Sequence, residues 1–205
     1  MALPLSRTMA GGTAGLVLAG GQSLRMGRNK ALLPVTEQQT LLQFMQRQLQ
    51  AAGCTPVLIS GAAVGGLPDR LPYAGPLAGI DAALHVLADQ SAITQLLVVP
   101  VDMPALSPAL LAELIAAGDG MTAVRFVGDS PLPLLLPNST AVRAAVAGEL
   151  QPAARRSLRD VLAKLPSRCL PLPPDVATAF ANLNTPADWL HWQQHWLQQA
   201  KGDVS

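Results

Sequence analysis

The sequence has few cysteines and few aromatic residues. Its two cysteines, Cys54 and Cys169, lie far apart and form no CxxC pair, so the spacing does not indicate a zinc site, an iron–sulfur site or a disulfide scaffold. We expect two reduced thiols, in the core or at the surface. Aromatic residues make up only 3% of the 205 residues, which disfavours a base-stacking platform for single-stranded nucleic acid.

Charge is also scarce, at 13% of residues, and it is nearly balanced, with 14 basic and 13 acidic side chains. Non-specific electrostatic binding to DNA or RNA needs an excess of basic residues, so no nucleic-acid partner is expected. No apolar run approaches the roughly 18 residues of a membrane span. The N-terminus has no hydrophobic segment behind Arg7, so we expect a flexible lead-in over residues 1–14 and a cytoplasmic protein.

Apolar residues are plentiful, at 50% of the chain, which is enough for a sizeable buried core. Residues 15–19, 56–60 and 95–101 read as buried strands, and helical patterns follow Thr40, cover 80–87 and follow Ser107. Alternating strands and helices predict right-handed βαβ units and a mainly parallel sheet. We therefore expect one α/β domain over residues 15–200.

The second half of the chain is less regular. Residues 121–127 and 132–136 are predicted to be strands, and Asn138 is expected to cap a helix that runs to residue 147. Another helix should begin after Ser157. The last helix has the strongest start signal, because Thr185, Pro186 and Asp188 supply an N-cap, a proline in the first turn and an acidic third residue.

The first strand runs into a glycine-punctuated, basic loop. Residues 18–30 read LAGGQSLRMGRNK, in which glycines would let backbone N–H groups approach phosphate oxygens. Arg25, Arg28 and Lys30 add positive charge. The spacing is neither a Walker A loop nor GxGxxG, so an ordinary glycine turn with solvated basic side chains remains the alternative.

Three segments together resemble one enzyme family. The run LAGGxSxRMGxxK over 18–30 resembles the nucleotide-binding signature of the nucleoside-triphosphate transferases. GPLAG at 75–79 and NLNTP at 182–186 look like motifs of the molybdenum cofactor guanylyltransferases, the MobA family. The resemblance spans residues 15–192. It implies a three-layer, Rossmann-like nucleotidyltransferase fold, with a mainly parallel central sheet flanked by helices.

The resemblance also implies a reaction, the transfer of GMP from GTP to the terminal phosphate of molybdopterin, with pyrophosphate leaving. GTP and molybdopterin would be the small-molecule substrates. Transient contact with proteins that deliver molybdopterin or mature molybdoenzymes would be expected. Because such a transfer spreads negative charge over oxygens, catalysis is chiefly positioning and charge neutralisation.

Asp102, at the end of strand 95–101, is the natural carboxylate for a divalent ion, because ligands bind beyond the carboxyl ends of parallel strands. Mg²⁺ is the expected ion, since oxygen ligands and phosphates suit it. Lys30 would neutralise the triphosphate and the leaving pyrophosphate, with Arg25 as a second candidate. Alternatively, Asp102 binds no metal and is only a turn residue before the next helix.

The resemblance assigns the remaining positions to substrates. The backbone of Leu18, Ala19 and Gly20 would contact the nucleotide, and Gly21 would support the phosphate turn. Ser60 and Asp69 are further nucleotide contacts, Asp69 as an acceptor for the guanine N–H groups. Asn182 and Asn184 would face the molybdopterin or complete the metal environment. Alternatively, both asparagine side chains form only local hydrogen bonds in the turn before the Thr185 cap.

The sequence departs from the family pattern in three places. Asn29 stands where many relatives have aspartate before the lysine, and residues 129–137 match the acceptor-side strand only loosely. Arg155, Arg156 and Arg159 could meet the pterin phosphate or could be a solvated helix start. A cytidylyltransferase using CTP, against which GPLAG argues, and a catalytically silent nucleotide-binding module remain alternative functions.

Two histidines in the last predicted helix have the spacing of the HExxH zinc-binding motif. His191 and His195 are four residues apart, but Trp192 takes the place of the glutamate and no third ligand is evident. Trp189, Trp192 and Trp196 recur at helical spacing and indicate an apolar face. We therefore assign this helix to packing.

Overall fold

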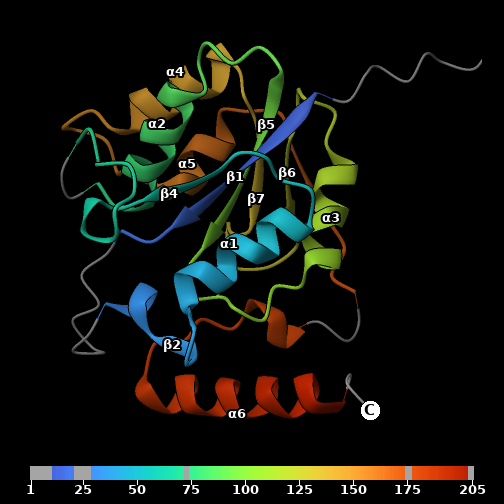
Figure 1. Cartoon of the computed structure of the whole chain (residues 1–205). Helices are drawn as coiled ribbons and strands as arrows, with labels where there is room; N and C mark the ends of the chain where they lie inside the picture. The colour runs from blue at the N-terminus through green and yellow to red at the C-terminus, as the bar shows by residue number, and fades with distance from the viewer. Residues whose placement is uncertain (1–10, 21–28, 72–73, 174–176, 203–205) are drawn as a thin grey trace, which may run out of the picture.

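A computed structural model describes residues 11–20, 29–71, 74–173 and 177–202 of the chain. Its centre is a six-stranded sheet in the order β4-β1-β5-β7-β6-β8 (Figure 1). The strands are β1 (Gly12–Leu18), β4 (Val57–Ser60), β5 (Ile93–Pro100), β6 (Ala123–Phe126), β7 (Leu134–Pro137) and β8 (Ser167–Leu170). Only β7 runs antiparallel to its neighbours β5 and β6, whereas the β1–β4, β1–β5 and β6–β8 pairs are parallel. The mainly parallel sheet is therefore confirmed.

Helices cover both faces of this sheet, which confirms the three-layer α/β prediction. The longer helices are α1 (Leu41–Ala51), α2 (Pro76–Val86), α3 (Pro108–Ala117), α4 (Thr140–Glu149), α5 (Leu158–Ala163) and α6 (Pro186–Gly202). In Figure 1, α2 and α4 lie on one side of the sheet and α3 on the other, and α6 crosses below its end. Short elements complete the chain: the hairpin β2 (Pro34–Thr36) and β3 (Gln39–Thr40), and the turns η1 (Lys30–Leu32), η2 (Ala62–Val64) and η3 (Ala177–Phe180).

The central strands are apolar because they are buried on both faces. Along β1, Leu16 and Leu18 pack in the cluster that contains α2, α4 and α5, while Val17 packs in the cluster of α1, α3 and Trp189. Strand β5 alternates in the same way. A continuous apolar run therefore behaves as two interleaved hydrophobic faces, as expected for central parallel strands. The carboxyl ends of β1 and β5 consequently emerge side by side between the two helical layers.

Local start signals placed most helices correctly. The Thr40 hydroxyl accepts from the N–H of Gln43 at 3.3 Å, and the Gln43 side chain accepts from the N–H of Thr40 at 2.9 Å, forming a capping box. Ser107 and Ser157 cap α3 and α5 through their hydroxyls. The Thr185 hydroxyl accepts from the N–H of Asp188 at 3.1 Å at the start of α6. These predictions hold because a cap depends on residues only three positions apart.

Several predicted boundaries are wrong. Strand β1 begins at Gly12, so residues 12–14 of the predicted lead-in belong to the sheet, where they pair with β5. Helix α2 begins at Pro76 instead of residue 80, so GPLAG forms its first turn behind Gly75, which has a φ of 62°. A proline in the first helical turn needs no N–H partner, which makes this start favourable. Helix α4 is capped by Ser139 and not by Asn138. The Asn138 amide donates instead to the carbonyls of Leu87 and Ile93, at 3.0 and 2.9 Å, and so joins α2 to β5.

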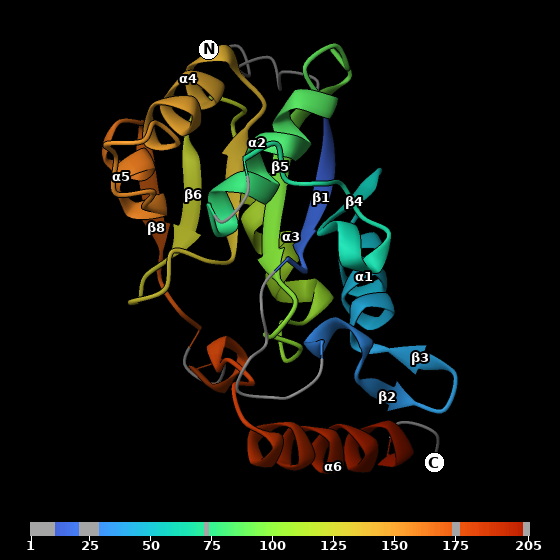
Figure 2. The same cartoon turned by 90° about the vertical axis from the view of Figure 1, so that its left-hand side faces the viewer.

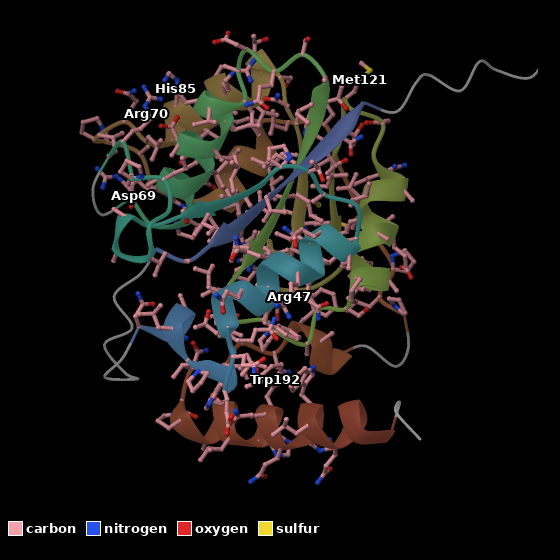
Figure 3. The ribbon with its side chains drawn as sticks, viewed as in Figure 1. Arg47, Asp69, Arg70, His85, Met121 and Trp192 are labelled. Carbon is pink, nitrogen blue, oxygen red and sulfur yellow. The ribbon has the colours of Figure 1, made fainter. Side chains whose placement is uncertain are left out.

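Helix α6 lies beyond the sheet and packs on α1. The Phe44 ring meets Trp192 edge-on with centroids 5.6 Å apart, and Trp196 at 5.5 Å; Figure 3 shows Trp192 directed from α6 toward α1. Trp189 is buried. The predicted packing role of the tryptophan face is confirmed. Among the described residues, no helix combines the length and apolar character that crossing a lipid bilayer requires.

A carboxylate holds the turn between α3 and β6, at the end of the sheet opposite α6. Asp119 Oδ1 accepts from the N–H groups of Met121 and Thr122 at 2.8 and 2.7 Å, and Oδ2 accepts from the Thr122 hydroxyl at 2.8 Å. These hydrogen bonds, led by that from Met121, lower the pKa of Asp119 below its usual 3.8. Hydrogen bonds to the ionised form favour it, which explains the direction.

We predict that Asp119→Ala destabilises the protein at neutral pH by about 1 kcal/mol or less, because water screens this exposed carboxylate. A lowered folded-state pKa gives stability that is present above pH 3.8 and is lost as the pH falls through the folded pKa. Thermal unfolding of wild type and variant at neutral pH and well below pH 3.8 measures this. A stability difference that grows on acidification would contradict the assignment.

Candidate active site

A cleft of about 260 Å³ opens beyond the carboxyl ends of β1 and β5, where ligands bind in parallel α/β sheets. Its lining comes from the end of β1, the segment before η1, the first residue of α2, the end of β5 and the loop before β7. The lining residues are Leu18, Ala19, Gly20, Asn29, Lys30, Pro76, Pro100, Val101, Asp102 and Leu132. Five of these, Leu18, Ala19, Gly20, Lys30 and Asp102, were predicted from the sequence.

At one side of the cleft, a lysine meets two oxygens from distant parts of the chain. Lys30 Nζ donates to Asp102 Oδ2 at 3.1 Å and to Asn184 Oδ1 at 2.9 Å. The Lys30 and Asp102 side chains are only 14% and 23% exposed, so water screens their attraction less than on an open surface. Lys30 and Asp102, which the family resemblance assigns to one triphosphate, therefore meet in the fold, and Asn184 joins them.

A local cap directs Lys30 toward the cleft. Asn29 precedes η1, and its side-chain oxygen accepts from the N–H of Ala31 at 3.1 Å. The N–H of Leu33 closes the turn on the Lys30 carbonyl at 3.1 Å, and the Ala31 side chain is fully buried. Asparagine therefore caps this turn through its side-chain oxygen, as aspartate would, without the negative charge.

Backbone hydrogen bonds of Val101 and Asp102 join the end of β5 to two neighbouring segments. The N–H of Val101 donates to the Leu18 carbonyl at 3.1 Å, which keeps the end of β5 beside the end of β1. The Asp102 carbonyl accepts from the N–H of Leu183 at 2.8 Å. This second bond brings the segment before α6 to the cleft and places Asn184 within reach of Lys30.

The floor of the cleft requires glycine at positions where backbones nearly touch. A Cβ on Gly79 of α2 would lie 2.6 Å from the Ser60 Cβ, and one on Gly61 would lie 3.0 Å from the Gly20 nitrogen. The first contact excludes a side chain. The second would force the neighbouring backbone to shift, and Gly61 also has a φ of 113°, which side chains rarely adopt. The ends of β1 and β4 and the first turn of α2 are therefore held in close contact beneath the cleft.

The remaining predicted site residues lie elsewhere. Ser60 is 2% exposed and buried against Gly79, Asp69 is exposed on the loop before α2 (Figure 3), and Asn182 is exposed before Leu183. In the part of the chain that the structure describes, these three do not line the cleft. Desolvation raises the pKa of Asp69 above its usual 3.8. Gly21 and Arg25 lie outside the described residues.

Several features that sequence reasoning did not identify complete the cleft. Leu132, from the loop before β7, and Pro76 both line it. No local pattern marks Leu132, but the Gly-Pro pair at 75–76 could have shown where α2 begins. Arg159 donates to the Asp129 carbonyl in the loop that carries Leu132. The structure thus gives Arg159 a contact within the protein. The Arg155 and Arg156 side chains are exposed, and the Arg155 charge acts on Glu149.

The donor set around Lys30 fits a hard divalent cation. Asp102 Oδ2 and Asn184 Oδ1 already face one positive charge, and oxygen is the ligand that Mg²⁺ prefers. Within residues 11–20, 29–71, 74–173 and 177–202, no cluster of three or more His, Cys, Asp or Glu side chains could enclose a metal alone. Phosphate and water oxygens would have to supply the other ligands, as is usual for Mg²⁺.

Neither the thiols nor the histidine pair belongs to the cleft. Cys54 is buried, which raises its thiol pKa to about 12, and Cys169 is exposed; neither forms a disulfide. His191 and His195 face each other on the exposed side of α6, with ring centroids 5.0 Å apart. These two thiols and two imidazoles are therefore not placed to act on a substrate in the cleft.

The cap on η1 gives a direct test of the role of Asn29. We predict that Asn29→Ala removes about 1 kcal/mol of local stability, and that Asn29→Asp retains it, since a carboxylate oxygen also accepts from Ala31. Hydrogen exchange at the Ala31 amide, followed by NMR in wild type and both variants, measures the difference. Equal exchange in all three proteins would show that the side chain does not cap this turn.

The sequence matches the family described as the MobA-like NTP transferase domain over residues 15–169. A relative from Xanthomonas euvesicatoria pv. vesicatoria (strain 85-10), named molybdenum cofactor guanylyltransferase, is 40% identical over 178 residues. That alignment covers 85% of this chain and 91% of the relative. The similarity therefore extends over nearly the full length of both proteins.

Two solved structures share the fold. One is molybdopterin-guanine dinucleotide biosynthesis protein A from Archaeoglobus fulgidus, with a TM-score of 0.70 and 18% identity, covering 90% of this chain and 99% of that one. The other is a Mycobacterium tuberculosis H37Rv protein, Rv0371c, in complex with manganese. It has a TM-score of 0.60 and 18% identity, covering 89% of this chain and 98% of that one. At these identities the likeness establishes the fold alone.

Proposed function

The chain belongs to the MobA-like NTP transferase family, and on that premise we propose that it transfers GMP from GTP to the terminal phosphate of molybdopterin. The products are molybdopterin guanine dinucleotide and pyrophosphate. The observation that carries this proposal is the meeting of Lys30, Asp102 and Asn184 at the mouth of the cleft. The 40% identical relative named molybdenum cofactor guanylyltransferase supports the choice of substrates.

The chemistry requires an in-line displacement at the α-phosphorus of GTP. An oxygen of the molybdopterin phosphate attacks, a new P–O bond forms, and the bond between the α-phosphorus and the bridging oxygen breaks as pyrophosphate leaves. The protein supplies no nucleophile, in agreement with the buried, high-pKa thiol of Cys54. Its contribution is to hold the reacting groups in line and to stabilise developing negative charge.

Lys30 is the residue that stabilises this charge. Lys30 lines the same cleft as residues 18–20 at the end of β1. Asp102 and Asn184 fix the direction of the ammonium through two hydrogen bonds. A cation held in place before substrate arrives does not have to reorganise as the phosphorus–oxygen bond breaks, which is the main advantage of electrostatic preorganisation.

Asp102 and Asn184 would also hold Mg²⁺, because their oxygens converge and phosphates can supply the other ligands. When bound, the ion would offset the charge of the triphosphate and of the departing pyrophosphate. The fold neighbour crystallised with manganese is consistent with a divalent ion in this architecture. The Asp102 carboxylate would then bind both the Lys30 ammonium and the ion.

The first turn of α2 supports GTP as the nucleotide. GPLAG forms this turn, and its Pro76 lines the cleft beside residues 18–20. Guanine offers adjacent N1–H and N2–H donors, which backbone carbonyls of the cleft could accept; Asp69, which lies outside the cleft, is not placed to do so. A catalytically silent module is disfavoured, because Asn29 preserves the cap next to Lys30 despite the lost charge.

We predict that the protein releases pyrophosphate from GTP in the presence of Mg²⁺ and molybdopterin, and that Lys30→Ala and Asp102→Ala each slow turnover by about 100-fold or more. Lys164→Ala is the matched control, because Lys164 makes an ion pair with Glu149 between α4 and α5 away from the cleft. The rates are compared at a temperature at which every variant is folded. GTP binding without turnover in the wild type would favour a silent module.

A second experiment addresses the nucleobase. We expect GTP to bind more tightly than CTP, since GPLAG resembles the motif of the guanylyltransferases and the 40% identical relative is named as one. Competition of unlabelled GTP and CTP against a labelled, non-hydrolysable GTP analogue gives both dissociation constants under one set of conditions. Tighter binding of CTP would reassign the protein as a cytidylyltransferase acting on the same acceptor.

A further inference from the structure

The residues that begin α6 form a cap whose hydrogen bonds extend to Lys30. Asp188 Oδ2 accepts from the N–H groups of Asn184 and Thr185, at 3.0 and 2.8 Å. In return the N–H of Asp188 donates to the Thr185 hydroxyl at 3.1 Å. An ordinary capping box needs only the two bonds between Thr185 and Asp188. The bond to the Asn184 N–H is additional, and Asn184 is the residue whose side chain meets Lys30.

The backbone of Asn184 is consequently fixed from both sides. The preceding residue, Leu183, donates its N–H to the Asp102 carbonyl at 2.8 Å, and Asn184 donates its own N–H to Asp188. The Asn184 residue is itself exposed, so packing does not select its side-chain conformation. Its direction is set by the hydrogen bond to Lys30, and a fixed backbone lowers the conformational entropy that this bond costs.

Helix α6 is also bonded to the segment that carries Lys30. The Gln193 side-chain amide donates to the carbonyls of Pro34 and Val35, at 2.9 and 3.1 Å. Trp192 and Trp196 pack on Phe44 of α1. The helix therefore lies along the chain from η1 to α1, below the sheet in Figures 1 and 2. A shift in the first turn of α6 would be transmitted to Lys30 through Asn184.

We propose that Asp188 is a positioning residue for the transfer reaction: by fixing the Asn184 backbone, it holds the Lys30 ammonium in its catalytic position. This inference deepens the proposed function and rests on it. Asp188 touches neither substrate nor reacting atoms. Its carboxylate also attracts the Lys30 ammonium through space, and Asp188→Asn removes that attraction while keeping an oxygen acceptor for the Asn184 N–H. The competing explanation is that Asp188 does nothing more than cap α6.

The two explanations differ in what each substitution should change. Asp188→Ala is expected to lower kcat for pyrophosphate release by about tenfold or more, because small displacements of a charge-stabilising group are costly. Asp188→Asn keeps an oxygen acceptor and is expected to restore kcat to within about threefold of wild type. Thr185→Ala removes the cap hydroxyl but leaves Asp188 on Asn184, so it should lower the melting temperature and preserve kcat.

A double-substitution cycle tests the route through Asn184. If Asp188 acts mainly by way of Asn184, most of the effect of Asp188→Ala on kcat should disappear in an Asn184→Ala background, giving strong non-additivity; the remainder measures the direct attraction between Asp188 and Lys30. Asp119→Ala is the matched control, since Asp119 also accepts from two backbone N–H groups and a threonine hydroxyl but lies at the other end of the sheet. It should leave kcat unchanged.

Three results would overturn the inference: wild-type kcat in Asp188→Ala, an undiminished effect of Asp188→Ala in the Asn184→Ala background, or equal losses of kcat in Asp188→Ala and Thr185→Ala. If Asp188→Ala does not fold, Asp188→Ser provides the same comparison, because serine suits the first helical turn but is too short to reach both N–H groups. A wild-type protein that releases no pyrophosphate would refute the proposed function itself, and is a separate outcome.

Discussion

The site depends on one cation held between two oxygens from distant parts of the chain. Lys30 lies 72 residues from Asp102 and 154 residues from Asn184, yet its ammonium bonds to both at 3.1 and 2.9 Å. A hydrogen bond tolerates only a few tenths of an ångström of error. The sheet, the turn that carries Lys30 and the C-terminal helix must therefore all be held in register for this small group of atoms to form.

The central sheet supplies the first part of that precision. Strands β1 and β5 are covered by helices on both faces, so their carboxyl ends cannot shift without opening a packed core. Gly79 allows α2 to approach Ser60 of β4 at a distance that a side chain would block, and Gly61 lies against the backbone of Gly20, just after β1. Close packing beneath the cleft thus gives its upper surface a fixed shape, on which a phosphate chain can be aligned.

Helix α6 supplies the second part, and its role is wider than its composition suggests. Its tryptophan face packs on Phe44, as an apolar stripe predicts. The polar residues at its start and along its side bond to the segment between Lys30 and Val35. The same helix therefore completes the hydrophobic core and fixes the polar contacts of the cleft, so stability and catalysis are coupled through it.

The sequence alone determined the α/β class, the caps at Thr40, Ser107 and Thr185, and the position of Asp102 at a strand end, because these features depend on patterns within a few residues. The sequence was misleading even locally where two capping candidates were adjacent. Asparagine and serine cap helices equally well, so the sequence did not separate Asn138 from Ser139 at the start of α4. The hydrogen bonds of Asn138 to α2 and β5 leave the cap to Ser139. Only the tertiary structure decided that Asn184 meets Lys30, that Leu132 lines the cleft and that Ser60 lies beneath it. Contacts across so many residues follow from the packing of the whole sheet and its helices, which no local pattern contains.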